Sequence, residues 1–337
     1  MRSRAAQIAL ALLVATALGA VPADAETIKV GLSRLLGYPA VPIAIERGYF
    51  KAQGLDVAMV FFDSAQPISV GVASGDLDFG VSGMSAGFYT LAAQGQLKLI
   101  AASGGEAPGF HAMAYLASPK AFAAGLTSPQ DLAGHSVAIT QLGTSLHYSI
   151  AVAAQRYGYP LSRVTVKALQ SNTNVIAALG GNTIDAAVLP ETTAAAAIAK
   201  GDAKFIGWVS DLATSLVSAS ACFTATKTAG ERGDMVRRFL IAYRHGLRDF
   251  HNAFITADGK RRDSASAPAM LELMEKFTGT SEDEIERTIP FVDPEGRIDA
   301  HSIDTQIAWY KSQNLIKSDV KAADIIDTHY ATLVSHP

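Results

Sequence analysis

The chain has 337 residues, of which 49% are hydrophobic and 18% are charged. This length allows two domains, and the composition supports large buried cores and excludes an intrinsically disordered chain. The net charge of -3 gives no basic excess for binding nucleic acid or an anionic membrane surface, so we expect neither as a partner.

The N-terminal residues are typical of an export signal. Two arginines precede an apolar run at 5–21, and an A-x-A sequence follows at 23–25. The run is shorter than the roughly 20 apolar residues that a membrane-spanning helix needs, and a proline ends it. We therefore predict a cleaved signal peptide over 1–25, a mature chain that begins near Glu26, and a location in the periplasm.

Similar segments occur twice along the mature chain. Val30, in the predicted strand 28–33, corresponds to Val137, and Asp78 corresponds to Asp185 with the same spacing. Each half has the order strand, loop, helix, strand, helix, strand, and strands that alternate with helices form parallel sheets covered by helices. The sequence therefore predicts an α/β protein of two lobes, each a mostly parallel sheet flanked by helices.

The chain after Gly230 is predicted to be mostly helical. Apolar positions at helical spacing occur over 235–254 and in three shorter segments further on. A strand-like segment at 222–226 indicates that the chain returns to the first sheet before this helical tail. We therefore expect lobe two to be inserted into a discontinuous lobe one. The predicted boundaries are 26–115 and 212–337 for lobe one and 116–211 for lobe two.

Five loops are predicted to follow strands at the carboxyl edges of the two sheets, where open α/β sheets bind ligands. Several carry Gly, Ser or Thr at the start of a helix, where free N–H groups and the helix dipole favour an anion. Ordinary helix capping is the alternative for each loop alone. We predict a small anionic or strongly hydrogen-bonding ligand between the lobes. The candidate ligand-binding residues are Gly37, Tyr38, Ser64, Gly83, Met84, Ser85, Gly143, Thr144, Ser145, His147 and Glu191.

One of these loops also fits a catalytic motif. The segment Gly83–Gly87 matches G-x-S-x-G, the nucleophile elbow of serine hydrolases, with Ser85 as the nucleophile. Such an enzyme also needs an acid, a histidine and an oxyanion loop, and no HGGG-like run precedes the elbow. A serine hydrolase is therefore an alternative to a binding protein. For His147, a hydrogen bond to the ligand and simple packing in a helix are both open.

Metal and redox chemistry have no motif in this sequence. The eight histidines are scattered, and neither H-E-x-x-H nor C-x-x-C occurs. Cys222 is the single cysteine, so no internal disulfide is possible and stability must come from core burial. We predict no metal, no cofactor and no catalytic residue.

Three segments resemble a known family. Asp78–Gly83, Gly143–Tyr148 and Gly181–Val188 look like segments of the periplasmic substrate-binding proteins of ABC importers for aliphatic sulfonates, nitrate and taurine, which are related to binders of pyrimidine precursors. The resemblance extends over essentially the whole mature chain. It implies a type II periplasmic binding protein that closes on its ligand around a two-stranded hinge.

The resemblance also implies a function and roles for residues. It implies the solute-binding component of an ABC import system, not an enzyme. This component is expected to be a monomer that captures a sulfonate- or carboxylate-like organic anion and delivers it to an inner-membrane permease. The implied ligand contacts come from Gly37 and Tyr38, from Ser82–Ser85 and from Gly143–Tyr148. Ser85 then donates a hydrogen bond to the ligand and is not a nucleophile.

One segment departs from the family's pattern. Sulfonate binders tend to have an aromatic-acid-proline-aromatic run where this chain has Leu189–Thr192. Because a carboxylate repels a pure anion, Glu191 either points away or accepts a hydrogen bond from an amine on a zwitterionic or heterocyclic ligand. A binder of an amine-bearing heterocycle, such as a pyrimidine precursor, is therefore a second interpretation. A sensory binding module is a third.

Overall fold

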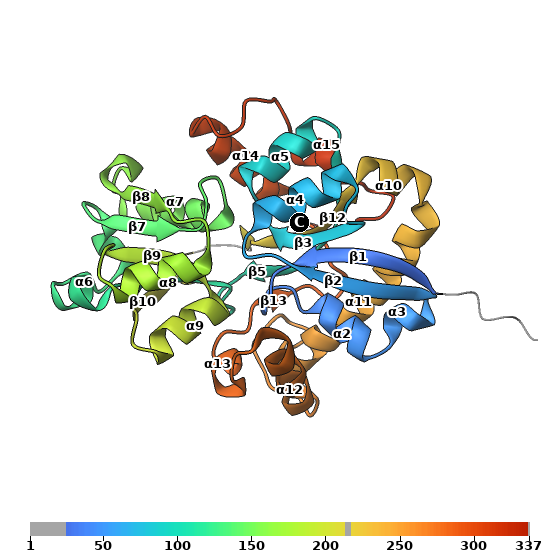
Figure 1. Ribbon diagram of the computed structural model, residues 1–337, viewed down its shortest axis with the longest axis horizontal. Helices are drawn as coiled ribbons and strands as arrows, with labels where there is room; N and C mark the ends of the chain where they lie inside the picture. Colours follow the sequence, from blue (N-terminus) through green and yellow to red (C-terminus); the bar gives the residue numbers. More distant parts are fainter. Residues whose placement is uncertain (1–24, 213–216, 336–337) are drawn as a thin grey trace, which may run out of the picture.

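The computed structural model describes residues 25–212 and 217–335, and it contains two separate five-stranded sheets that are flanked by helices (Figure 1). All but the last residue of the predicted signal peptide lies outside the described residues. Within the described part of the chain, no helix is long and apolar enough to cross a membrane.

The first sheet has the strand order β2-β1-β3-β12-β4. Strand β1 pairs in parallel with β2 and β3, whereas β12 runs antiparallel to both of its neighbours. A strand from late in the chain therefore lies between two early ones. The strands are β1 (Glu26–Leu32), β2 (Leu55–Phe61), β3 (Phe79–Gly83), β4 (Leu97–Ala102) and β12 (Ser220–Ala225).

The second sheet has the same arrangement, read as β8-β7-β9-β6-β10. Strand β7 pairs in parallel with β8 and β9, and β6 is the antiparallel strand between β9 and β10. The strands are β6 (Met113–Ala117), β7 (Ser136–Ile139), β8 (Thr165–Ala168), β9 (Ala186–Pro190) and β10 (Lys204–Trp208).

The sequence repeat is visible in the hydrogen bonds of both sheets. Asp78 accepts a hydrogen bond from the backbone N–H of Lys29 at 2.8 Å, and Asp185 accepts one from the backbone N–H of Ser136 at 2.8 Å. In each case the carboxylate precedes the central strand of its half and ties that strand to the first one. The two aspartates that revealed the repeat therefore have the same structural role.

Helices cover both faces of the first sheet (Figure 1). One face packs against α2 (Ala40–Glu46), α3 (Tyr49–Ala52), α11 (Gly233–Phe254) and α12 (Ala267–Thr278). The other face packs against α4 (Ala65–Ser74), α5 (Ala86–Ala93), α14 (Ala300–Ser312) and α15 (Ala322–Ile325). The predicted helix over 235–254 is α11, and its buried Phe239 stacks on Phe79 with ring centroids 3.8 Å apart. The short α10 (Thr226–Glu231) precedes α11.

The second sheet is covered in the same way. Helices α6 (Pro119–Ala123) and α7 (Ser145–Tyr157) pack on one face together with the short 3-10 helices Pro129–Leu132 and Leu161–Arg163. Helices α8 (Asn172–Gly180) and α9 (Glu191–Ala199) pack on the other face.

Two segments connect the sheets, and they pair with each other where they cross. Strand β5 (Gly104–Glu106) lies between β11 (Val217–Ser218) and β13 (Phe291–Val292), with α13 (Glu282–Glu286) shortly before β13. The chain enters the second sheet at β6, so the predicted boundary at 115/116 falls within that strand. The proposed division into lobes stays a prediction.

Candidate ligand-binding site

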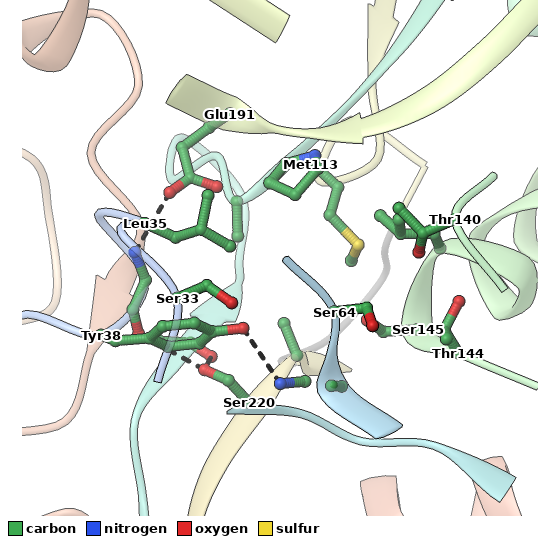
Figure 2. A pocket seen from close by; sticks show the side chains of 18 of the residues that line it. Ser33, Leu35, Tyr38, Ser64, Met113, Thr140, Thr144, Ser145, Glu191 and Ser220 are labelled. Carbon is green, nitrogen blue, oxygen red and sulfur yellow. Dashed lines mark hydrogen bonds between the residues drawn. The ribbon is translucent and has the colours of Figure 1, made fainter. Parts of the chain in front are cut away.

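A small cavity lies between the two sheets, at the ends of their strands (Figure 2). Its volume is about 80 Å³, well below the several hundred Å³ of cavities that bury drug-sized molecules. The loops of the first sheet contribute Ser33, Leu35, Gly37, Tyr38, Asp63, Ser64, Ala65, Gly83, Ala219 and Ser220. The connecting segment and the second sheet contribute Gly104, Ala112, Met113, Thr140, Thr144, Ser145, Leu146, Asn172, Pro190 and Glu191.

The loop after β1 is fixed by backbone contacts. The carbonyl oxygen of Gly37 accepts hydrogen bonds from the hydroxyl of Ser103 at 2.8 Å and from the N–H of Gly104 at 2.9 Å. A Cβ atom on Gly104 would lie 2.8 Å from that carbonyl oxygen, so the close approach requires glycine there. The hydroxyl of Tyr38 accepts from the N–H of Gly83 at 3.0 Å. Burial raises the pKa of Tyr38, which therefore stays a neutral donor at the cavity wall.

The loop that contains Ser85 joins the two halves of the molecule. Ser85 is the N-cap of α5, and its hydroxyl accepts from the backbone N–H of Phe88 at 3.1 Å. Ser85 also forms an isolated antiparallel bridge with Thr144, beside a 2.6 Å hydrogen bond from the N–H of Ala86 to the carbonyl of Gly143. Ser85 is only 1% exposed and does not line the cavity, and the adjacent Met84 does not line it either. The serine of the G-x-S-x-G sequence is thus used for capping.

The matching loop of the second half opens helix α7. Thr144 and Ser145 line the cavity, whereas Gly143 and His147 lie behind it. Gly143 has φ +72° and packs against Ala86, which restricts this position to glycine. The Nδ1 atom of His147 accepts from the N–H of Gly143 at 3.1 Å. Burial lowers the pKa of His147 to about 4, so the ring is neutral near pH 7 and supports the loop.

Three helices of the described structure, α4, α7 and α9, begin at the cavity without a side-chain cap, and the N-cap residue of α9 is Pro190. Ser64 is the N-cap residue of α4 and Thr144 that of α7, but neither side chain bonds to the first turn of its helix. The hydroxyl of Thr144 donates to the carbonyl of Gln141 at 2.9 Å. By contrast, Ser85 caps α5 and Ser171 caps α8. The first N–H groups of α4 and α7 therefore lack the side-chain acceptor that α5 and α8 have.

Glu191 is the first residue of α9 and the one buried acid in the described lining. Its Oε1 atom accepts from the N–H of Gly37 at 3.1 Å, which links α9 to the loop after β1. Burial raises the pKa of Glu191 to about 8, and backbone hydrogen bonds oppose this shift. The described lining also includes the exposed Asp63, but it contains no lysine, arginine or histidine.

A second buried carboxyl lies next to this site and was missed by the sequence analysis. Glu106, on β5, is 0% exposed, and neither carboxyl oxygen completes a hydrogen bond with a described residue, although the N–H groups of Ala112 and Met113 lie nearby. Burial raises the pKa of Glu106 well above its usual range, and Glu191 adds to the shift. A glutamate in the glycine-rich sequence SGGEAPG is typical of a solvated turn, so the sequence carried no signal for its burial.

Several lining residues were also missed, namely Ser33, Asp63, Thr140, Asn172 and Ser220. One signal could have found Asn172. It follows Ser171, and Ser171 is the counterpart of Ser64 in the sequence repeat. The Oδ1 atom of Asn172 is buried and has no hydrogen-bond partner among the described residues.

The sheets, the crossing segments and the cavity between them define the fold of the periplasmic binding proteins. A similar structure is the alkanesulfonate-binding protein SsuA from Xanthomonas axonopodis pv. citri bound to MOPS, with a TM-score of 0.71 and 17% identity over 90% of this chain and 99% of that chain. The periplasmic nitrate-binding protein NrtA from Synechocystis PCC 6803 has a TM-score of 0.68 and 11% identity, over 88% and 84%.

A third similar structure is the ligand-binding component of an ABC-type import system from Staphylococcus aureus, with a TM-score of 0.71 and 11% identity over 90% of this chain and 97% of that chain. These likenesses confirm the predicted fold class. The chain belongs to the NMT1/THI5-like family, whose model matches residues 40–253. No curated protein matched the sequence.

Proposed function

We propose that this protein is the solute-binding component of an ABC import system. In this proposal it captures a small organic anion between its two lobes in the periplasm and delivers it to a membrane permease. The family and the fold support binding without chemistry. The hydroxyl of Ser85 is engaged as a helix cap, which counts against the hydrolase alternative.

The observation that carries the proposal is that the uncapped helices α4 and α7 both begin at the cavity. Helices α4 and α7 come from different halves of the molecule, and both begin beside the cavity without a side-chain cap. Their free N–H groups and positive dipole ends suit an anion without any lysine or arginine. The hydroxyls of Ser64 and Ser145 add donors.

The candidate residues separate into two roles. We propose direct ligand contacts for the seven that line the cavity, which are Gly37, Tyr38, Ser64, Gly83, Thr144, Ser145 and Glu191. For the other four we propose support of the loops, and these are Met84, Ser85, Gly143 and His147. We also propose that the protein acts as a monomer.

Thermal-shift screening tests the function. Alkanesulfonates, small carboxylates and nitrate are added to the purified mature protein, and a ligand at 100 times its Kd is expected to stabilise it by about 2.7 kcal/mol. Ser145→Ala is expected to weaken binding of the hit at least several-fold, whereas the control Ser74→Ala, on the exposed end of α4, leaves it unchanged. If no organic anion stabilises the protein, the proposed function fails.

A further inference from the structure

Two walls of the cavity differ in chemistry. Figure 2 shows Glu191 on one side of the pocket and Ser64, Thr144 and Ser145 together on another. The hydroxyl side carries the uncapped starts of α4 and α7, which suit an anion. The opposite side carries a buried carboxyl, which suits a cation or a strong N–H donor.

We propose that Glu191 is a cation-binding pole of the cavity. The ligand is then a dipolar molecule whose ammonium or amidinium group meets this carboxylate while its anionic group lies at α4 and α7. This inference rests on the proposed function and names the chemical class of its ligand.

In the described part of the chain, the surroundings of Glu191 supply no basic side chain for it, and its only positive partners are backbone N–H groups and the start of α9. It is 2% exposed, and among the described residues that line the cavity there is no basic side chain. A buried carboxylate without a cationic partner is costly to ionise even where backbone N–H groups bond to it, and a ligand that brings the missing cation lowers that cost. A simple structural latch to the N–H of Gly37 would not need a charged side chain, because a neutral amide accepts the same hydrogen bond.

A second buried acid, Glu106, lies beside this pole, and burial keeps it protonated, so it adds no negative charge there. It lies behind the cavity wall formed by Ala112 and Met113, fully buried and without a hydrogen-bond partner among the described residues. The other ionisable group facing Glu191 is the neutral Tyr38. The charged residues Glu284 and Arg287, on and next to α13, approach α9 at its far end, near Ile198. A cation bound at Glu191 therefore meets no competing basic side chain in the described lining.

The proposal predicts that binding of a cationic ligand releases a proton from Glu191. The free protein holds a proton on Glu191 below pH 8, because the pKa is about 8. A ligand cation lowers this pKa and expels the proton, so affinity rises with pH up to about 8. A ligand with only an anionic group should show the opposite pH dependence. Ionised Glu191 repels it, so its affinity falls above pH 8.

The test compares matched probes by isothermal titration calorimetry. Propane-1-sulfonate is paired with 3-aminopropane-1-sulfonate, and propanoate with 3-aminopropanoate, in buffers of different ionisation enthalpy at pH 7. We expect the wild-type protein to prefer the amino member of a pair at least tenfold and to release close to one proton per ligand. Glu191→Gln is expected to remove both effects, whereas the exposed control Glu275→Gln keeps them.

The outcomes separate this inference from the proposed function. If the wild-type protein binds both members of a pair equally and releases no proton, the cationic pole is refuted and the anion-binding function stands. If Glu191→Gln weakens both members by the same factor, Glu191 is a latch and the inference also fails. If no anion binds with or without an amine, the function itself fails. The wild-type pH profile gives a readout that does not depend on how the variant folds.

Discussion

The position of Ser85 in the sequence fits two different roles, a catalytic nucleophile and the N-cap of a helix. Its position in G-x-S-x-G is that of a nucleophile, but its hydroxyl accepts from the N–H of Phe88 and its backbone bridges to Thr144. Both contacts follow from the local chain, because serine at the start of a helix is a strong N-cap. The sequence could predict the cap and could not predict the bridge, which depends on how the two halves meet.

Ser85→Ala is therefore expected to affect stability more than chemistry. Losing the cap of α5 should cost about 1 kcal/mol of unfolding free energy, measured by denaturant melts. Ser74→Ala serves as the control and should change it by less than about 0.5 kcal/mol. Covalent labelling of Ser85 in the wild-type protein by a fluorophosphonate would contradict this interpretation. It would support the alternative that the protein is a serine hydrolase.

Glu106 gives a prediction about pH. The pKa of its carboxyl is raised in the folded protein, mainly by burial, from an ordinary value near 4.5. As pH rises above 4.5, the unfolded chain ionises while the folded protein keeps the proton, so this group lowers stability progressively with pH. Glu106→Gln should therefore raise stability relative to wild type by more at pH 8 than at pH 5, as measured by urea melts.

One result would contradict this prediction for Glu106. Equal differences between Glu106→Gln and wild type at both pH values would show that the carboxyl is ionised and paired in the folded protein. Glu275→Gln, on an exposed part of α12, controls for the general loss of a negative charge.

At the scale of elements, helix α11 packs directly against the backbone of α2. A Cβ atom on Gly246 would lie 2.3 Å from the carbonyl oxygen of Ala40, and no side-chain rotation relieves a clash with backbone. Alanine gains up to about 1 kcal/mol in helix propensity, but overpacking costs about 1–3 kcal/mol. Gly246→Ala should therefore lower the melting temperature by several degrees.

Gly230→Ala is the matched control for this substitution. Gly230 also lies in a helix, α10, but a Cβ atom there meets no atom within 4 Å. Propensity then decides, and the variant should be as stable as wild type or more stable by up to about 1 kcal/mol. An equal loss for both variants, measured by calorimetry, would show that the contact with α2 is not the cause.

The elements that the sequence predicted are those with a strong periodic pattern. The long amphipathic α11 and the paired strands around Asp78 and Asp185 were recognisable because apolar spacing and a repeated carboxylate marked them. Strands β5, β11 and β13 were not, because two or three residues carry no period. Their pairing, and the burial of Glu106 within it, depends on contacts between distant segments.

At the scale of the whole molecule, the bridge between Ser85 and Thr144 offers a way to hold the halves together. Directly opposed residues in antiparallel bridges have Cα atoms about 4.5–5.5 Å apart, within disulfide range. The double variant Ser85→Cys with Thr144→Cys should form a disulfide that slows ligand release, measured by stopped-flow. Cys222 is fully buried and should not compete.

Two results would oppose this prediction. If oxidation forms no disulfide, the loops do not stay opposed in solution. If the disulfide forms and ligand release is unchanged, separation of the two halves is not needed for exchange. Reduction of the same sample provides the internal control.

The place of β12 between β3 and β4 has a consequence for biosynthesis. Until Ala225 has left the ribosome, the first sheet lacks its inner partner, although the whole second sheet has already been made. At about 5–20 residues per second, this wait after β4 lasts roughly 6–25 s. The sheet whose strands are begun first is thus the one that is completed last.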